Sequence, residues 1–388
     1  WYAFYLSIIL VSSFFIVEGY RWLTYVRNLG AYLSGFFVLL ILSNRVKNER
    51  SLNQILNALL IVVLLVGFFG LLGVIGIWRP VIESMVGLFL PDSIANTSYG
   101  KTIIIRSIGT RGWFIGLGEY FRLTGLFLFA NHYATVIVYT LPILFFKSNQ
   151  SRNWRKILIN LAIIMMMVNL IYTTSRVALL AVIGGGVYFV SFHSFYRRKI
   201  RIFIALVLTF TVLVLLLWTF TDLASPYEPG FLNLINESIQ SFVFARGEGS
   251  FTSRSAVYQA SFEGFRQRPF FGWGTERDVP GLTYPAGSHS EYIAVIYRQG
   301  IVGLIAFLGL IISSWRITRP PKGAAARTPE GSFLRYGRWL FVAALINSVA
   351  TDPAIDTTVY FMFWLNIGLL VAAALLVRRN SYHAITQR

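Results

Sequence analysis

Apolar runs of helical length recur along the whole chain, separated by short polar stretches. Examples are Ile55–Ile77, Ile157–Tyr172 and Tyr360–Val377, each near the ~17–25 residues that a helix needs to cross a bilayer. The runs and the breakers between them predict spans at residues 2–18, 29–44, 53–77, 123–146, 157–173, 177–195, 202–220, 291–314, 338–350 and 358–377. The pattern therefore predicts an all-α, polytopic transmembrane bundle of about ten spans, with residues 1–388 as a single integral membrane domain.

Two connections between the predicted spans are long, at residues 78–122 and 221–290, and a long connection is usually functional. The second of them contains two patterns typical of short helices. Phe231–Phe244 gathers its apolar side chains on one face, which predicts a helix lying on the membrane surface. Ser253–Gln267 also has an apolar stripe and ends before Pro269, which breaks the chain.

The composition agrees with a membrane protein, because 56% of the residues are hydrophobic and only 13% are charged. The sequence contains no cysteine, which excludes disulfides, thiolate metal ligands and cysteine nucleophiles. A formal charge of +18 would suggest a nucleic-acid partner in a soluble protein. Here we assign it to loops that orient the helices and contact membrane lipids, and we find no nucleic-acid-binding module.

The distribution of basic residues predicts how the helices are oriented. More than half of the 34 Lys and Arg residues lie in connections on one side of the bundle, at residues 45–50, 147–156, 197–201, 316–338 and 378–388. Short basic loops face the cytoplasm, so both termini are predicted to be cytoplasmic and the two long connections to lie on the outer face. Ionisable residues are nearly absent from the predicted helix centres, which argues against a transporter.

The tripeptide Thr-Ser-Arg occurs twice, ending at Arg176 and at Arg254, each time at the outer start of a predicted helix. A cation in the first turn opposes the helix macrodipole by ~0.3–1 kcal/mol, and a bound anion removes that conflict. Helix N-termini favour phosphate, and an arginine fork adds charge-assisted hydrogen bonds. Two such positions predict a ligand with two phosphates. The alternative is that each arginine reaches the interface and contacts lipid headgroups.

A third candidate, His289, lies immediately before the predicted span at 291–314. A helix N-terminus biases histidine toward its neutral form, which is the form that a general base requires. The nearby Gly281, Pro285 and Gly287 predict a loop folded for close approach. The alternative is an interfacial histidine without a chemical role.

Taken together, "YTTSRVALLAV", "SRSAVYQASFEGFRQRPFFGWG" and "SHSEYIAVIYRQGIVG" resemble the core of the O-antigen ligase and O-antigen polymerase superfamily. The upstream "RLTGLFLFANHYAT" resembles a block that often precedes this core. The resemblance covers roughly Arg122 to Gly303 and rests on the order, spacing and common outer face of these segments. It implies metal-independent, inverting glycosyl transfer without a cofactor, on the periplasmic face of the bacterial inner (plasma) membrane.

The resemblance also implies roles for the three candidates. The donor would be a glycan on undecaprenyl diphosphate, and Arg176 and Arg254 would bind and neutralise its diphosphate. His289 would take a proton from the acceptor hydroxyl, or orient it. The acceptor would be a second lipid-linked glycan in a polymerase, lipid A–core in a ligase, or a hydroxyl of another surface polymer. The chain has "SHSEY" where many members have His-Asn, and a short segment separates Arg254 from His289. These differences leave open to which branch of the superfamily the chain would belong.

Other residues have two or more interpretations each. Arg122 either pairs with Glu119 or grips the lipid donor, and Asp352 either orients His289, holds a sugar or is a solvated loop residue. Tyr258 either stacks on a sugar or packs in the core. The functional alternative is a polyprenyl-diphosphate-glycan transporter or lipid-binding protein, which would use the same arginines without catalysis.

Overall fold

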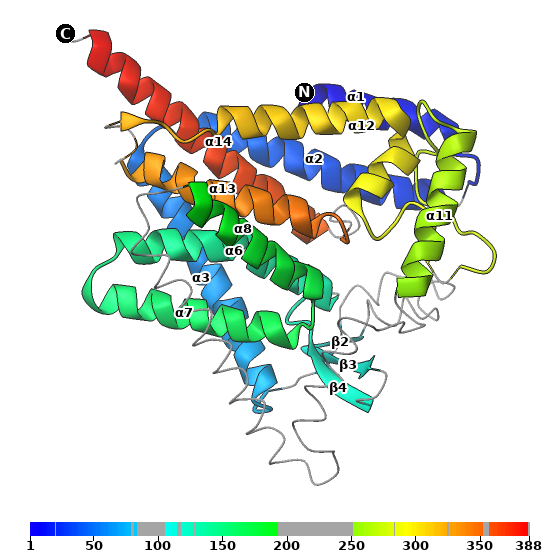
Figure 1. Ribbon diagram of the computed structural model, residues 1–388, viewed down its shortest axis with the longest axis horizontal. Helices are drawn as coiled ribbons and strands as arrows, with labels where there is room; N and C mark the ends of the chain where they lie inside the picture. The colour runs from blue at the N-terminus through cyan, green and yellow to red at the C-terminus, as the bar shows by residue number, and fades with distance from the viewer. Residues whose placement is uncertain are drawn as a thin grey trace.

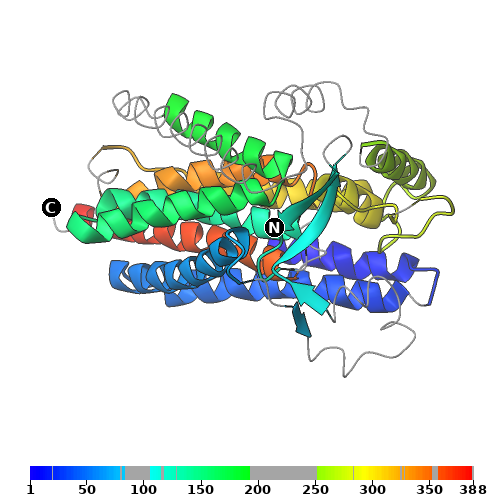
Figure 2. The same ribbon diagram turned by 90° about the horizontal axis from the view of Figure 1, so that it is seen from below.

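The computed structural model describes residues 1–19, 21–78, 81–83, 105–114, 118–127, 129–192, 251–282, 284–323, 326, 328–351 and 357–386. In this part of the chain the structure is a helical bundle (Figures 1 and 2). Its helices are α1 (Tyr2–Ser12), α2 (Arg21–Arg45), α3 (Glu49–Val74), α6 (Ala130–Gln150), α7 (Asn153–Tyr172), α8 (Arg176–Phe192), α11 (Phe251–Gln267), α12 (Glu291–Ile317), α13 (Pro329–Asn347) and α14 (Thr357–Thr386). A short 3-10 helix at Ser13–Phe15 follows α1.

Helices α3 and α13 begin with side-chain caps that their sequences provide. The Asn48 side chain accepts a hydrogen bond of 2.8 Å from the Ser51 N–H at the start of α3. Thr328 caps α13 in the same way, accepting from the Gly331 N–H at 3.1 Å, and Pro329 occupies the first turn. These caps satisfy backbone N–H groups that have no partner within the helix.

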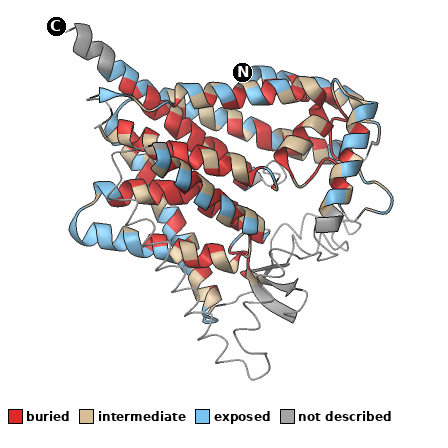
Figure 3. Cartoon of the chain, in the orientation of Figure 1, coloured by how far each residue is buried: buried red, intermediate tan, exposed pale blue. Residues whose placement is uncertain are grey.

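Burial separates the centre of the bundle from its lipid-facing helices (Figure 3). In the most apolar stretch of α14, 78% of the residues are buried. In the corresponding stretches of α3 and α7, only 28% are buried. Small residues let the helices approach closely, as at Gly185, where a Cβ would lie 2.4 Å from the Trp339 ring. Such close contact through small residues is a main source of helix association in membranes.

The break in α12 fixes the loop that precedes this helix. Gly300 has φ 67° and ψ −165°, so the helical hydrogen-bond ladder is interrupted there. The backbone of the loop uses the freed groups: the Ile301 N–H donates to Pro269 O at 2.8 Å, and the Gly274 N–H donates to Arg298 O at 2.8 Å. Irregular backbone is thus satisfied by protein partners, as it must be away from water.

Helices occupy nine of the ten expected spans, and the span expected at 202–220 lies outside the described residues. Within the described part of the chain, five helices are long and apolar enough to cross a membrane: α2, α3, α7, α12 and the Thr358–Asn380 part of α14. The total of about ten spans stays a prediction. Of the helices expected in the second long connection, α11 coincides with Ser253–Gln267, and Phe231–Phe244 is outside the described residues.

Two expected starts were wrong. The second span was expected to begin at residue 29, but α2 begins at Arg21. The fourth span was expected to begin at residue 123, but α6 begins at Ala130, after strand β4 (Gly118–Leu123) and a turn with Gly125 at φ 59°. The ninth span, expected at 338–350, begins earlier in the structure: α13 starts at Pro329, because the Thr328 cap starts the helix among residues that are not apolar.

The first long connection contains short strands that the apolar pattern does not predict. Strand β1 (Val81–Glu83) pairs antiparallel with β2 (Ile105–Ser107). Strand β3 (Gly109–Phe114) pairs antiparallel with β4 (Gly118–Leu123), with Trp113 opposite Glu119. The ribbons lie at the same end of the bundle as the start of α8 (Figure 1).

Candidate functional site

The starts of α8, α11 and α12 lie toward one end of the bundle, where α11 stands across the other helices (Figure 1). These starts bring Arg176, Arg254 and His289 to that end, because the first two lie in first turns and His289 lies two residues before α12. The predicted grouping of the three candidates is therefore compatible with the arrangement of the helices.

Arg176 is the first residue of α8, and its side chain is exposed. The turn before it contains Thr174 in the left-handed region, with φ 53°. Ser175 stands in the capping position, since its carbonyl accepts the N–H of Leu179 at 3.1 Å.

Arg122, at the end of β4, holds this turn in place. Its Nε donates to the Thr173 carbonyl at 3.0 Å, and its Nη2 donates to Asn131 Oδ1 at 2.8 Å. The contact links the β3–β4 ribbon, the first turn of α6 and the turn before Arg176. Arg122 thus positions this turn, and its role in binding a lipid donor stays a prediction.

Asn131 and His132 lie in the first turn of α6, whereas the expected start of the fourth span at residue 123 would place them about two turns inside it. The later start of the helix accounts for the difference. Asn131 has a structural role, because its Oδ1 accepts the hydrogen bond from Arg122.

Helix α11 carries Arg254, Tyr258 and Ser261 at spacings of four and three residues, which place side chains on one face of a helix. The Tyr258 hydroxyl donates to the His289 carbonyl at 3.4 Å, and Ser261 Oγ accepts the Gly287 N–H at 2.8 Å. Burial raises the pKa of Tyr258, and the Arg254 charge opposes that change. One face of α11 therefore carries the candidate anion-binding arginine and holds the loop of the candidate base.

His289 has a left-handed backbone, with φ 65°, which is uncommon for a residue other than glycine. Its half-buried imidazole makes a T-shaped contact with the Tyr284 ring, with centroids 4.4 Å apart and an interplanar angle of 88°. Its Nε2 is buried and makes no hydrogen bond to the described part of the chain. Backbone strain and an unsatisfied buried nitrogen at one residue are features typical of functional sites.

Burial lowers the pKa of His289 to about 4, and the nearby Arg254 charge contributes to the same decrease. The imidazole is therefore neutral at pH 7 and can accept a proton. The sequence also predicted a lowered pKa for His289, but from the dipole of the following helix. In the structure the causes are burial and the charge of Arg254.

The start of α12 is tied to the end of α13. The Glu291 N–H donates to the carbonyls of Ser348 and Thr351, both at 3.0 Å. The Glu291 side chain is buried and occupies the first turn of α12, where a carboxylate complements the macrodipole. A small cavity beside it is lined by Tyr292, Ser348 and Tyr360 together with apolar side chains.

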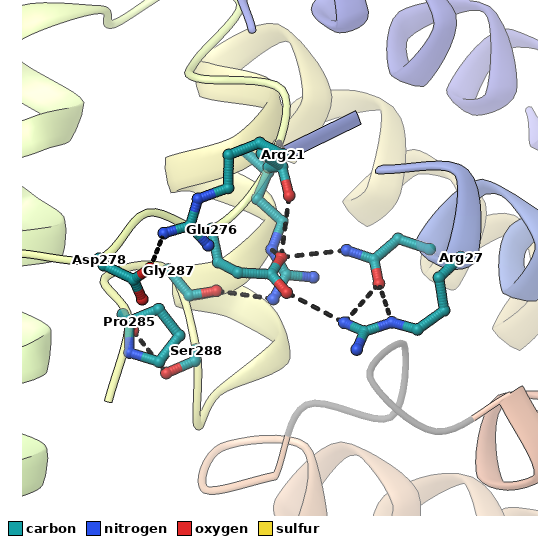
Figure 4. A network of polar contacts seen from close by, with 10 residues as sticks. Arg21, Arg27, Glu276, Asp278, Pro285, Gly287 and Ser288 are labelled. Carbon is teal, nitrogen blue, oxygen red and sulfur yellow. Dashed lines mark hydrogen bonds and ion pairs between the residues drawn. The ribbon is translucent and has the colours of Figure 1, made fainter. Parts of the chain in front are cut away.

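A buried ionic cluster pins the loop between α11 and α12 to helix α2 (Figure 4). Glu276 accepts hydrogen bonds of 3.0 Å from Arg27 Nη2 and from Asn28 Nδ2. Its Oε2 also lies 3.3 Å from Arg298 Nε in an ion pair. Burial alone would raise the pKa of Glu276, but Arg298 and Arg27 hold that pKa below its ordinary value.

Sequence reasoning missed Glu276, Arg298 and Ser261. The available signal was Arg298 itself, a cation two turns inside a predicted span, where an ionisable residue marks a function or a specific partner.

Among the expected site residues, the structure brings Arg254, Tyr258 and His289 together and places Arg176 on another helix at the same end. Asp352 lies outside the described residues. Among the described residues, no group of three or more His, Asp or Glu side chains is placed to hold a metal ion.

The family model described as O-antigen ligase matches residues 161–308 of the chain. The matched range includes Arg176, Arg254 and His289, and it supports the O-antigen ligase and polymerase superfamily. A comparison with curated protein sequences found no match.

Proposed function

We propose, from the match of residues 161–308 to the O-antigen ligase family, that the protein is a membrane glycosyltransferase. It would transfer a glycan from undecaprenyl diphosphate to an acceptor hydroxyl, on the periplasmic face of the inner membrane. The observation that carries the proposal is the placement of His289: Tyr258, from the helix that bears Arg254, holds its backbone, and its buried Nε2 makes no hydrogen bond within the described residues.

The donor would bind through its diphosphate. The exposed Arg176, at the N-terminus of α8, and the half-buried Arg254, in the first turn of α11, offer guanidinium forks beside helix N-termini. Both features favour phosphate oxygens. When the bond between the anomeric carbon and the diphosphate oxygen breaks, negative charge accumulates on the leaving group, and the two arginines stabilise that charge.

The acceptor would be activated by His289. Its neutral imidazole accepts the proton of the acceptor hydroxyl while the oxygen attacks the anomeric carbon. Attack on the side opposite the leaving diphosphate inverts the configuration at that carbon. The proton remains on His289 until it is released to solvent, and the diphosphate leaves on its polyprenyl carrier.

The test is transfer by purified protein in lipid nanodiscs supplied with a glycan on undecaprenyl diphosphate, with and without lipid A–core. Longer glycans on the polyprenyl carrier would identify a polymerase, and a product on lipid A–core would identify a ligase. A lipid-binding protein or transporter would bind the donor and form no product.

A further inference from the structure

Gly287, two residues before His289, is held at both polar groups of its backbone. Its N–H donates to Ser261 Oγ at 2.8 Å, and its carbonyl accepts from Arg298 Nη2 at 2.8 Å. The Ser261 and Arg298 side chains are both buried. Gly287 has φ 79°, and a Cβ there would lie 2.4 Å from the Tyr297 ring. The loop is therefore clamped against α11 and α12 at one specific residue.

The two clamping side chains come from the two helices that flank the loop. Ser261 lies on the face of α11 that also carries Arg254 and Tyr258, and Tyr258 contacts the His289 carbonyl. Arg298 lies two turns into α12, just before its break at Gly300. The clamp thus fixes His289 relative to Arg254 through one helix and relative to the membrane bundle through the other.

Arg298 is itself oriented by an acid. Its Nε lies 3.3 Å from Glu276 Oε2, while its Nη2 reaches Gly287, so the planar fork engages two partners at once. Glu276 is in turn held by Arg27 and Asn28 of α2 (Figure 4). A lysine could satisfy one of these partners but not both, because it is a point charge without a fork.

We propose that Ser261 and Arg298 are positioning residues for His289, with Glu276 orienting Arg298. This inference rests on the proposed function, since it assigns the clamp to the alignment of the base. A left-handed backbone at a residue other than glycine persists only where its surroundings impose it. The Gly287 clamp and the Tyr258 contact impose it here. Without the clamp, the loop relaxes and the imidazole moves away from Arg254 and toward solvent.

Ser261→Ala and Arg298→Lys test the proposal in full-length protein in nanodiscs. Each should lower kcat by roughly 10- to 100-fold, since a displacement of about 1 Å can cost that much, while KM for the donor changes less than about twofold. The pKa of the acid limb of kcat/KM, which reports the free enzyme, should also rise from about 4 toward the ordinary value of histidine, because the imidazole becomes hydrated. Ser261→Thr keeps the hydroxyl and should restore both quantities.

Glu18→Gln is the matched control. It weakens the ion pair between Glu18 and Arg277, which also anchors this loop, and leaves the Ser261 and Arg298 hydrogen bonds to Gly287 in place. It should keep the kcat and the acid limb of the wild type. If Arg298→Lys fails to fold, which thermal unfolding reports, Ser261→Ala decides the question alone.

The outcomes separate this inference from the proposed function. Retained transfer by His289→Ala in the same assay would remove the function on which the inference depends. Loss of transfer in His289→Ala, with wild-type kcat and acid limb in folded Ser261→Ala, would overturn the positioning role and leave the proposed function intact. A change confined to KM would also overturn the positioning role.

Discussion

The hydroxyl of Tyr258 donates a hydrogen bond to the main-chain carbonyl of His289, with 3.4 Å between the oxygens. Tyr258 lies one helical turn after Arg254 on α11, so a single helix connects the candidate base with a candidate ligand of the donor. This contact gives Tyr258 a further role, holding the His289 backbone, beside the predicted alternatives of stacking on a sugar or packing in the core.

Tyr258→Phe should lower kcat by roughly three- to tenfold, as expected for loss of a hydrogen bond worth about 1 kcal/mol. The ring remains, so stacking on a sugar would be preserved and KM for the acceptor should not change. Steady-state kinetics with varied acceptor measures both quantities. If the hydrogen bond had no role, Tyr258→Phe would match the wild type.

Arg176→Ala and Arg254→Ala should each weaken donor binding by roughly 10- to 100-fold, since a hydrogen bond to a charged group contributes about 1.5–3 kcal/mol. Binding of undecaprenyl diphosphate to protein in nanodiscs gives the comparison. Arg266→Ala is the control, because Arg266 is an exposed arginine in the last turn of the same helix as Arg254. Unchanged affinity in both test variants would contradict the assigned roles.

Transfer should persist down to about pH 5 and fall as the pH drops through about 4, where His289 becomes protonated. The sign follows from burial, which lowers the pKa below its ordinary value near 6.5 and favours the neutral form in the folded protein. For the same reason, the contribution of His289 to folding stability is complete above about pH 6.5 and is lost as the pH falls toward 4. Histidine NMR titration and the pH dependence of kcat/KM report the pKa in the free enzyme, and a value near 6.5 would show a solvated imidazole.

Gly185→Ala should destabilise the bundle by about 1–3 kcal/mol, the usual cost of overpacking a core. The new Cβ would lie 2.4 Å from the Trp339 ring and 2.7 Å from the Trp339 carbonyl. Thermal unfolding in detergent should therefore show a lower Tm. Gly30→Ala on α2 serves as the control, because a Cβ at Gly30 would have no other atom within 4 Å among the described residues. Equal Tm values for the two variants would contradict the tight packing of α8 on α13.

The helices could be located from the sequence because long apolar runs and the breakers between them follow from the requirements of a bilayer. α7 and α12 begin within a few residues of the expected positions. The β3–β4 ribbon was missed because strands of six residues give a weak periodic signal. The apolar residues after Leu123 were therefore assigned to the fourth span.

The site was partly predictable for a similar reason. Thr-Ser-Arg at a helix start and a histidine before a helix are local patterns, so Arg176, Arg254 and His289 could be proposed from sequence. Glu276, by contrast, contacts residues of α2 and α12. Its α2 partner Asn28 lies 248 residues away in the sequence. Contacts of that kind depend on tertiary packing, and local patterns do not predict them.

The most direct test of the proposed mechanism is a single-turnover transfer assay with His289→Ala and a glycan on undecaprenyl diphosphate. His383→Ala, in the last turns of α14, is the control. We expect His289→Ala to bind donor with wild-type affinity and to transfer glycan at least about 100-fold more slowly, which is the usual contribution of general-base catalysis. Wild-type transfer by His289→Ala would contradict the mechanism.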